Sequence, residues 1–176
     1  MKIGVFSDLH DNLQHLDQVK EGFIKNQVEQ IFFCGDFSAP FAMRGFIDFN
    51  LPIKAVLGNN DSDIEKFLYQ LGKIPELKDM QMDLHFRFHD FMLENRRIAI
   101  IHGDEPSLLD VLIESQFYDA IFRGHTHKPS IEQKGKTLLV NPGALVGWMY
   151  DQGGKCPYSY AIYDTNENSA VIYSIE

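Results

Sequence analysis

The chain has 176 residues, of which 44% are hydrophobic and 23% charged, and its formal net charge at pH 7 is −9. This length and composition predict a single folded domain, residues 1–176, and exclude a disordered tail or a coiled coil. The excess of acidic residues argues against non-specific binding to nucleic acid or to an anionic membrane.

Neither membrane insertion nor a disulfide framework is indicated. No apolar run approaches the ~20 residues that span a bilayer, and the N-terminal apolar run meets Ser7 too early for a signal peptide. Of the two cysteines, we expect Cys34 to be a small core residue and Cys156 an exposed loop thiol. The default expectation is a cytoplasmic protein without a membrane partner.

The first half of the chain alternates short β-branched or aromatic runs with helical patterns. Strands are expected at residues 2–6, 30–34 and 53–57, and helices at residues 11–27, 39–48 and 62–71. Asp11 and Ser62 are candidate N-caps. This βαβαβ order predicts a mostly parallel sheet with helical crossovers.

The second half carries hairpin signals. Residues 82–89 alternate apolar and polar side chains, which predicts a half-exposed strand with Asp83, His85, Arg87 and His89 toward solvent. A helix is expected near residues 106–116. Further strands are expected at residues 97–101, 120–122, 131–133, 137–141, 158–164 and 170–175, and the last four form two hairpins. Together the halves predict an α/β fold of two packed mixed β-sheets flanked by helices.

Five of the expected strands are followed directly by polar side chains. The segments are Ser7-Asp8-Leu9-His10, Gly35-Asp36, Gly58-Asn59-Asn60-Asp61, His102-Gly103-Asp104 and Arg123-Gly124-His125-Thr126-His127. Parallel strands bring their carboxyl ends to one edge, where α/β sheets bind ligands. Asp8 and His10 are two residues apart, as are His125 and His127, so each pair points to one side unless a tight turn intervenes.

In this order the segments resemble the calcineurin-like metallophosphoesterase superfamily, and most closely its small single-domain phosphodiesterase branch. The resemblance runs from Met1 to about Gly143 and includes Asn141-Pro142-Gly143. It implies a β-sandwich flanked by helices. It also implies two divalent ions, one bound by Asp8, His10 and His127, the other by Asn59, His102 and His125, with Asp36 bridging them.

The implied reaction is hydrolysis of a small phosphate ester, either a phosphodiester or an activated phosphomonoester. Paired ions in such sites lie ~3.5–4 Å apart, and a hydroxide that bridges them is the nucleophile. Oxygen and imidazole ligands without a thiolate favour Mn²⁺, Fe, Zn²⁺ or Ni²⁺ over Cu(I), and manganese is our first expectation. Asp36 and Asn60 are the expected catalytic residues.

Two positions depart from the family pattern. Many members have a histidine where this chain has Asn60, and an amide cannot give up a proton to a leaving group. Asp104 stands where the branch often has a second histidine. Asp61 is equally well explained as a partner that orients a ligand or as a helix N-cap. Trp148 and Tyr150 could stack on an aromatic leaving group, although a loop anchor or subunit contact is the simpler reading.

Other functional classes stay open at this point. One alternative is a scaffold or interaction protein of this fold with weak catalysis, since the superfamily includes an endosomal coat subunit with altered ligand positions. A mononuclear zinc hydrolase is a third reading that explains fewer of the motifs. A homo-oligomer is also compatible with the sequence.

Overall fold

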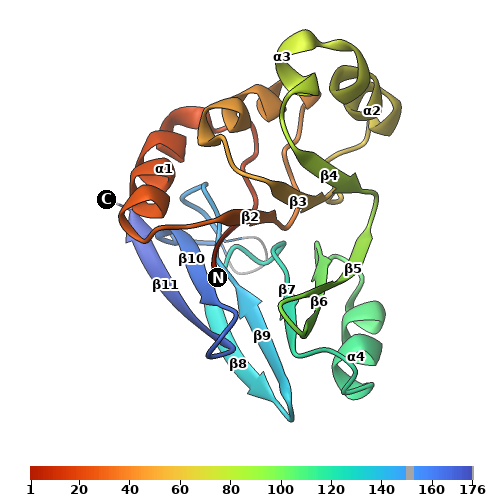
Figure 1. Cartoon of the computed structure of the whole chain (residues 1–176), viewed down its shortest axis with the longest axis vertical. Helices are drawn as coiled ribbons and strands as arrows, with labels where there is room; N and C mark the ends of the chain where they lie inside the picture. The colour runs from red at the N-terminus through yellow and green to blue at the C-terminus, as the bar shows by residue number, and fades with distance from the viewer. Residues whose placement is uncertain (150–152, 176) are drawn as a thin grey trace.

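The computed structural model describes residues 1–149 and 153–175, and its strands form two sheets (Figure 1). The six-stranded sheet has the order β11-β10-β1-β2-β3-β4, and the five-stranded sheet has the order β5-β6-β7-β9-β8. The strands are β1 (Lys2–Phe6), β2 (Gln30–Phe33), β3 (Ile53–Val56), β4 (Met82–His85), β5 (Phe88–Leu93), β6 (Arg96–Ile101), β7 (Ala120–Phe122), β8 (Ser130–Lys134), β9 (Thr137–Asn141), β10 (Tyr158–Asp164) and β11 (Ser169–Ile175).

Helices flank the two sheets. They are α1 (Leu16–Lys25), α2 (Ile64–Lys73), α3 (Pro75–Lys78) and α4 (Pro106–Glu114), together with the 3-10 helices η1 (Leu13–His15) and η2 (Pro40–Phe49). In Figure 1, α1, α2 and α3 lie on the side of β1–β4, whereas α4 lies beside β5–β7. The predicted α/β fold of two mixed sheets with flanking helices is therefore confirmed.

Each sheet contains a parallel block. β1, β2, β3 and β4 pair in parallel, as do β6, β7 and β9, whereas β10, β11, β5 and β8 pair antiparallel. In register, Phe6 lies opposite Phe33 on β2, and Ile100 lies opposite Phe122 on β7. Because neighbouring parallel strands end at similar heights, each block delivers its following loops to one edge.

The alternation of side chains along the strands creates two apolar layers on the faces of the six-stranded sheet. Val5 and Phe32 point between the two sheets, where they pack with Ile100 from the other sheet. Phe6 and Phe33 point the other way, under the helices, with ring centroids 5.1 Å apart. Fully burying each such side chain contributes about 1.5–3 kcal/mol, so the strands that carry the site are firmly anchored.

The N-terminal helix begins later than predicted. Residues 13–15 form a 3-10 turn and the α-helix starts only at Leu16, so Asp11 is not its N-cap. The Asp11 carboxylate instead accepts a hydrogen bond from the Ala39 amide at 3.0 Å. Likewise, Asp63 rather than Ser62 caps α2, because its side chain accepts from Lys66 N. The prediction for α2 missed the capping residue by one position, whereas no side chain caps the start of α1.

The strand predicted at residues 82–89 is divided. Phe86 and Arg87 carry the chain from β4 in one sheet to β5 in the other. The prediction of a single half-exposed strand was therefore wrong. His89 was expected to face solvent but is only 4% exposed. Cys156 is also buried rather than exposed, whereas Cys34 is buried as predicted. Among residues 1–149 and 153–175, no helix has the length and apolarity to cross a membrane.

Candidate metal centre

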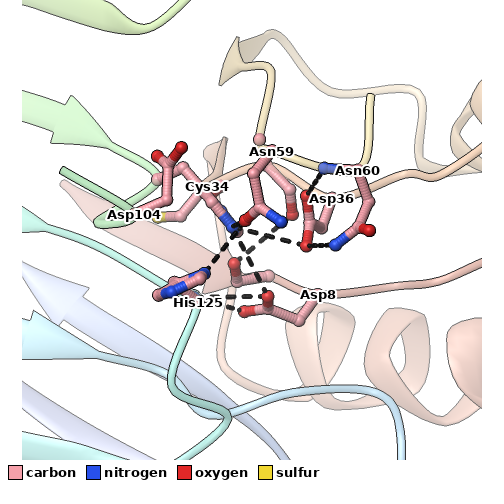
Figure 2. Close-up of polar contacts among 12 residues, drawn as sticks. Asp8, Cys34, Asp36, Asn59, Asn60, Asp104 and His125 are labelled. Carbon is pink, nitrogen blue, oxygen red and sulfur yellow. Dashed lines mark hydrogen bonds and ion pairs between the residues drawn. The ribbon is translucent and has the colours of Figure 1, made fainter. Parts of the chain in front are cut away.

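The polar segments that follow β1, β2, β3, β6 and β7 meet at one place. All seven predicted ligand residues lie there: Asp8, His10, Asp36, Asn59, His102, His125 and His127. Figure 2 shows the side chains of Asp36 and Asn59 facing those of Asp8 and His125. Two sheets therefore contribute to the site, which lies where their parallel blocks end.

One group of donors consists of Asp8, His10 and His127. The Nε2 atoms of His10 and His127 lie 3.1 Å apart. The Asp8 Oδ1 atom lies 3.4 Å from His127 Nε2 and 3.9 Å from His10 Nε2. Donor atoms of these three side chains all lie within 4.8 Å of one another, which is close enough for one ion.

The second group consists of Asn59, His102 and His125. The Asn59 Oδ1 atom lies 3.0 Å from both His102 Nε2 and His125 Nδ1. One carbonyl oxygen thus faces two imidazole nitrogens from the other sheet. His125 and His127 therefore serve different groups, although they are only two residues apart.

Asp36 lies between the two groups. Its Oδ2 atom is 3.5 Å from His10 Nε2 and 3.4 Å from His102 Nε2. Asn60 holds the same carboxylate, donating from its backbone amide to Oδ1 at 2.9 Å and from its side-chain amide to Oδ2 at 2.7 Å (Figure 2). The Asn60 amide is thus directed at Asp36.

Tight backbone turns, rather than extended segments, aim these ligands. Asp8 and His10 have φ angles of 54° and 46°, and His125 and His127 have φ angles of 70° and 59°. A left-handed conformation is uncommon for residues other than glycine. The expectation that each i, i+2 pair points to one side therefore fails for His125 and His127, because a tight turn does intervene.

Two glycines make the close approach of these loops feasible. A Cβ atom on Gly124 would lie 1.9 Å from Ser7 Oγ and 2.4 Å from Asp8 Oδ2. A Cβ atom on Gly58 would lie 2.2 Å from Asp36 Oδ1. Any side chain at either position would displace a carboxylate of the site.

The outer nitrogens of three histidines are held by the surrounding structure. His102 Nδ1 donates to the Cys34 carbonyl at 2.8 Å, and His127 Nδ1 donates to the Trp148 carbonyl at 2.7 Å. His10 Nδ1 lies 3.2 Å from Ser38 Oγ. Because a carbonyl only accepts, the neutral rings of His102 and His127 present the Nε2 lone pair to the centre.

Electrostatics of the site favour positive charge. Burial of His102 disfavours its charged form, but hydrogen bonding to Asp36 and the charges of Asp8 and Asp36 outweigh this and raise its pKa to about 9. Burial also opposes ionisation of Asp36, but contacts with His102 and Asn60 hold the pKa of that carboxyl well below its usual range. Without a cation, the two carboxylates draw a proton onto a buried imidazole.

Divalent metal ions fit this donor set. The Nε2 lone pair of His127 faces His10 Nε2 at 3.1 Å, an arrangement that repels unless a proton or cation lies between the rings. Carboxylate, amide oxygen and imidazole suit Mn²⁺, Fe, Zn²⁺ and Ni²⁺. The residues present could therefore hold such ions, with Asp36 in contact with both groups.

Asp61 acts outside the donor set. Its carboxylate accepts from the backbone amides of Gly58 at 2.8 Å, Ser38 at 2.8 Å and Asp36 at 3.0 Å. Burial raises the pKa of Asp61 to about 6. The sequence left two roles open for Asp61, and the N-cap is excluded because Asp63 caps α2. Asp61 instead links the loops after β2 and β3 through these hydrogen bonds.

Two supporting residues were missed or undervalued by sequence reasoning. Asn141 donates to the Gly124 carbonyl at 2.9 Å and so fixes the turn that carries His125 and His127; its place in the Asn-Pro-Gly segment was the available signal. Trp148 packs against His127 and His10, with ring centroids 4.5 and 5.6 Å away, and is 47% exposed. Tyr150 lies outside the described residues.

The second departure from the family pattern also lies at the edge of the site. Asp104 forms an ion pair with Arg87, which lies in the connection between β4 and β5. Figure 2 shows Asp104 on the side of the site where Asn59 and His125 lie. A position that could carry a histidine therefore carries a carboxylate that is neutralised by an arginine.

Comparison with known proteins assigns the family. The chain matches the calcineurin-like phosphoesterase superfamily domain over residues 1–168. Phosphodiesterase MJ0936 of Methanocaldococcus jannaschii is 33% identical over 154 residues, which cover 85% of this chain and 87% of that protein. The solved structure of an archaeal phosphodiesterase has a TM-score of 0.85 and 30% identity, covering 99% of this chain and 100% of the other.

The chain therefore belongs to the calcineurin-like phosphoesterase superfamily, and it is a metal-dependent phosphoesterase. The resemblance inferred from the ordered motifs is confirmed. Vacuolar protein sorting 29 from Cryptosporidium parvum also shares the fold, with a TM-score of 0.66 over 99% of this chain and 96% of that one. At 17% identity, this likeness shows a common fold alone.

Proposed function

We propose that the chain hydrolyses phosphodiesters and activated phosphomonoesters at a dinuclear metal centre, with a metal-bridging hydroxide as the nucleophile. The proposed ligands are Asp8, His10 and His127 for one ion, Asn59, His102 and His125 for the other, and Asp36 as the bridge. Manganese is the first candidate, and iron, zinc and nickel are the alternatives. Residues 1–176 are proposed to form one domain around this centre, because strands of both sheets share a buried core.

The position of Asp36 carries this proposal. One of its oxygen atoms lies 3.5 Å from His10 and 3.4 Å from His102, which belong to different donor groups. A mononuclear zinc site would need only one group and would leave the Asn59 and His125 pairing unexplained. The arrangement therefore supports two ions that share one carboxylate.

The residues around the centre supply charge and order. Divalent ions held here would activate a water molecule and neutralise the oxygens of the phosphoryl group. Asn60 anchors both oxygens of Asp36, so the carboxylate stays ionised and correctly turned. The carbonyls of Cys34 and Trp148 keep two imidazoles in the tautomer that can bind a metal.

The same geometry favours esters with good leaving groups. Asn60 cannot transfer a proton, and its side-chain amide is already engaged with Asp36. General acid–base help is worth about 10²–10⁴-fold, so alkyl esters should react much more slowly than nitrophenyl esters. The exposed Trp148 ring beside His10 and His127 offers a surface on which an aromatic leaving group could stack.

A scaffold role without catalysis has no comparable support. The Vps29 neighbour is similar in fold only, whereas this chain brings all seven ligand types together in two groups. A scaffold has no need of carboxylate, amide-oxygen and imidazole donors gathered in two groups around one shared carboxylate, whereas metal ions require such a set. The enzyme is therefore the function that the site supports best.

The test is a metal-by-substrate screen on chelated protein. The protein is reconstituted separately with manganese, iron, zinc or nickel and given bis(p-nitrophenyl) phosphate, p-nitrophenyl phosphate and a dialkyl phosphate. We expect activity to return with metal, manganese being the most effective, and nitrophenyl esters to be preferred. Undiminished hydrolysis by the chelated protein, or no hydrolysis with any of the four metals, would contradict the proposal.

A further inference from the structure

A second cluster of aspartate and histidine lies on the two edge strands next to β3 and β6, outside the donor groups of the centre. Asp83 and His85 are on β4, the edge strand of one sheet, and His89 is on β5, the edge strand of the other. Because residues two apart on a strand point to the same face, Asp83 and His85 share a side. The short connection through residues 86–87 joins β4 to β5 (Figure 1), and His89 lies against both residues. We call Asp83, His85 and His89 the edge cluster.

The three side chains of the edge cluster converge. Asp83 Oδ1 lies 3.2 Å from His85 Nε2, and Asp83 Oδ2 lies 3.2 Å from His89 Nε2. The two imidazole rings stack with centroids 3.8 Å apart and an interplanar angle of 17°. The Asp83 carboxylate therefore faces the Nε2 atom of each ring. Donor atoms of all three residues lie within 4.8 Å of one another.

His89 is an unusual residue for its surroundings. It is 4% exposed and packs on Phe91, with ring centroids 4.8 Å apart, yet its Nδ1 atom has no hydrogen-bond partner among the described residues. An apolar side chain would fill this space without leaving a buried nitrogen unpaired. Burial, assisted by the charges of His85 and Lys54, lowers the pKa of His89 to about 4, so the ring is neutral at pH 7. A neutral imidazole is the form that binds metals.

A cation already lies at this cluster. Lys54 from β3 places its Nζ atom 2.9 Å from Asp83 Oδ2 and 4.6 Å from the centroid of the Phe91 ring. The carboxylate thus attracts positive charge at the point where the two imidazoles end. Because the lysine side chain is long and reaches the cluster from a neighbouring strand, it can withdraw toward solvent when a stronger cation arrives.

We propose that Asp83, His85 and His89 bind a single transition-metal ion of the zinc class, separate from the dinuclear centre. Two imidazoles and one carboxylate, with a water as the fourth ligand, form a set that Zn²⁺ accepts in tetrahedral geometry. The ion replaces Lys54 as the partner of Asp83. Since the ligands come from the edge strands of both sheets, the ion links β4 to β5 and so joins one sheet to the other.

The experiment counts zinc ions bound to the full-length chelated protein at a fixed free zinc concentration, by elemental analysis and by calorimetric titration. His85→Asn removes the exposed imidazole and leaves the buried one in place, so the variant should fold. His15→Asn is the matched control, because His15 is a partly exposed histidine that lies on Tyr158 and outside both clusters. The wild type and His15→Asn should bind one zinc ion more than His85→Asn binds.

A second variant tests the competition with lysine. Lys54→Met removes the resident cation and should tighten binding of the additional ion by at least about threefold. This factor corresponds to the free energy of an exposed ion pair. Equal zinc counts for the wild type and His85→Asn would overturn the proposal, as would unchanged affinity in Lys54→Met. Because these readouts count ions and not ester hydrolysis, they are independent of whether the proposed activity is correct.

Discussion

The proposed dinuclear centre and the edge cluster use the same types of side chain but hold them differently. In the centre, His102 and His127 are each fixed by a backbone carbonyl on the far side of the ring. In the edge cluster, His89 has an unpartnered Nδ1 atom and shares one carboxylate with His85. The comparison teaches that ligand type alone does not define a strong site. Hydrogen bonds that fix the outer nitrogen of each imidazole also matter, so the centre should bind metal more tightly than the edge cluster does.

Backbone strain separates the two regions in the same way. Asp8, Asp36 and His125 all have φ angles between 54° and 70°, whereas no residue of the edge cluster has a positive φ. Sparsely populated backbone conformations cost of order 1–3 kcal/mol each and persist only where the surrounding structure enforces them. Of these two regions, only the centre carries this cost, which is expected of a site that needs fixed geometry.

The largest expected effect is at Asp36. Asp36→Asn should lower hydrolysis of bis(p-nitrophenyl) phosphate in manganese by more than about 100-fold, because loss of an outer partner alone typically costs about 10–100-fold. Rates and bound manganese would be measured together. Asp110→Asn, on the exposed side of α4, is the control and should retain full activity. Undiminished activity in Asp36→Asn would exclude the bridging role.

The next effect concerns the proton that Asn60 cannot supply. Asn60→His should raise turnover of alkyl phosphodiesters by about tenfold or more, and turnover of nitrophenyl esters much less, because only poor leaving groups need general acid help. The ratio of kcat values for the two ester classes is the measurement. Asn60→Gln keeps an amide and should not change this ratio. A similar gain on both classes would remove the leaving-group argument.

His89 in the edge cluster and His102 in the centre should have opposite effects on how stability changes with pH. The folded-state pKa of His89 is lowered to about 4, so between pH 6.5 and 4 the unfolded chain binds a proton that the folded chain does not. Stability therefore falls as the pH drops, by about 1–2 kcal/mol between pH 7 and 5 from this residue. The pKa of His102 is raised instead, so its contribution without metal is lost as the pH rises toward 9.

Denaturant unfolding of metal-free wild type and His89→Gln at pH 7 and pH 5 measures this effect. The free energy of unfolding of the variant should change less over the interval, because its residue 89 cannot titrate. Identical pH dependence in the two proteins would show that His89 is not held neutral by burial.

The smallest expected effect is at Trp148. Trp148→Ala should raise KM for nitrophenyl esters about threefold to tenfold, as expected for loss of one aromatic contact, and leave KM for alkyl esters nearly unchanged. Steady-state kinetics on both esters measure it. Trp148→Phe should recover most of the loss because it keeps an aromatic ring, and an equal rise for both esters would argue against stacking.

Much of the site could be predicted because its signals are local. Each ligand segment directly follows an apolar strand, and parallel pairing fixes where those strands end, so the meeting of Asp8, Asp36 and Asn59 required only the strand pattern and the rule for sheet edges. The two mixed sheets followed from the change between parallel and hairpin signals. The roles of the individual ligands came from the family resemblance.

The errors arose where tertiary contacts decide. The alternation in residues 82–89 continues through a change of sheet, because period 2 does not reveal which sheet a strand joins. Asp11 has a left-handed φ angle and bonds to Ala39, a partner that local sequence cannot indicate. Trp148 reaches His127 only because the loop after β9 folds back, with Leu145 N bonded to the Asp8 carbonyl.

Trp148 is the sole tryptophan of the chain, and its indole ring packs against two imidazoles of the centre. The tryptophan fluorescence of the protein therefore originates beside one of the two proposed ion positions. A paramagnetic ion such as Mn²⁺ bound there would quench this emission, whereas an ion at the edge cluster would leave it nearly unaltered. The molecule thus carries its own optical probe, which can distinguish filling of one site from filling of the other without any attached dye.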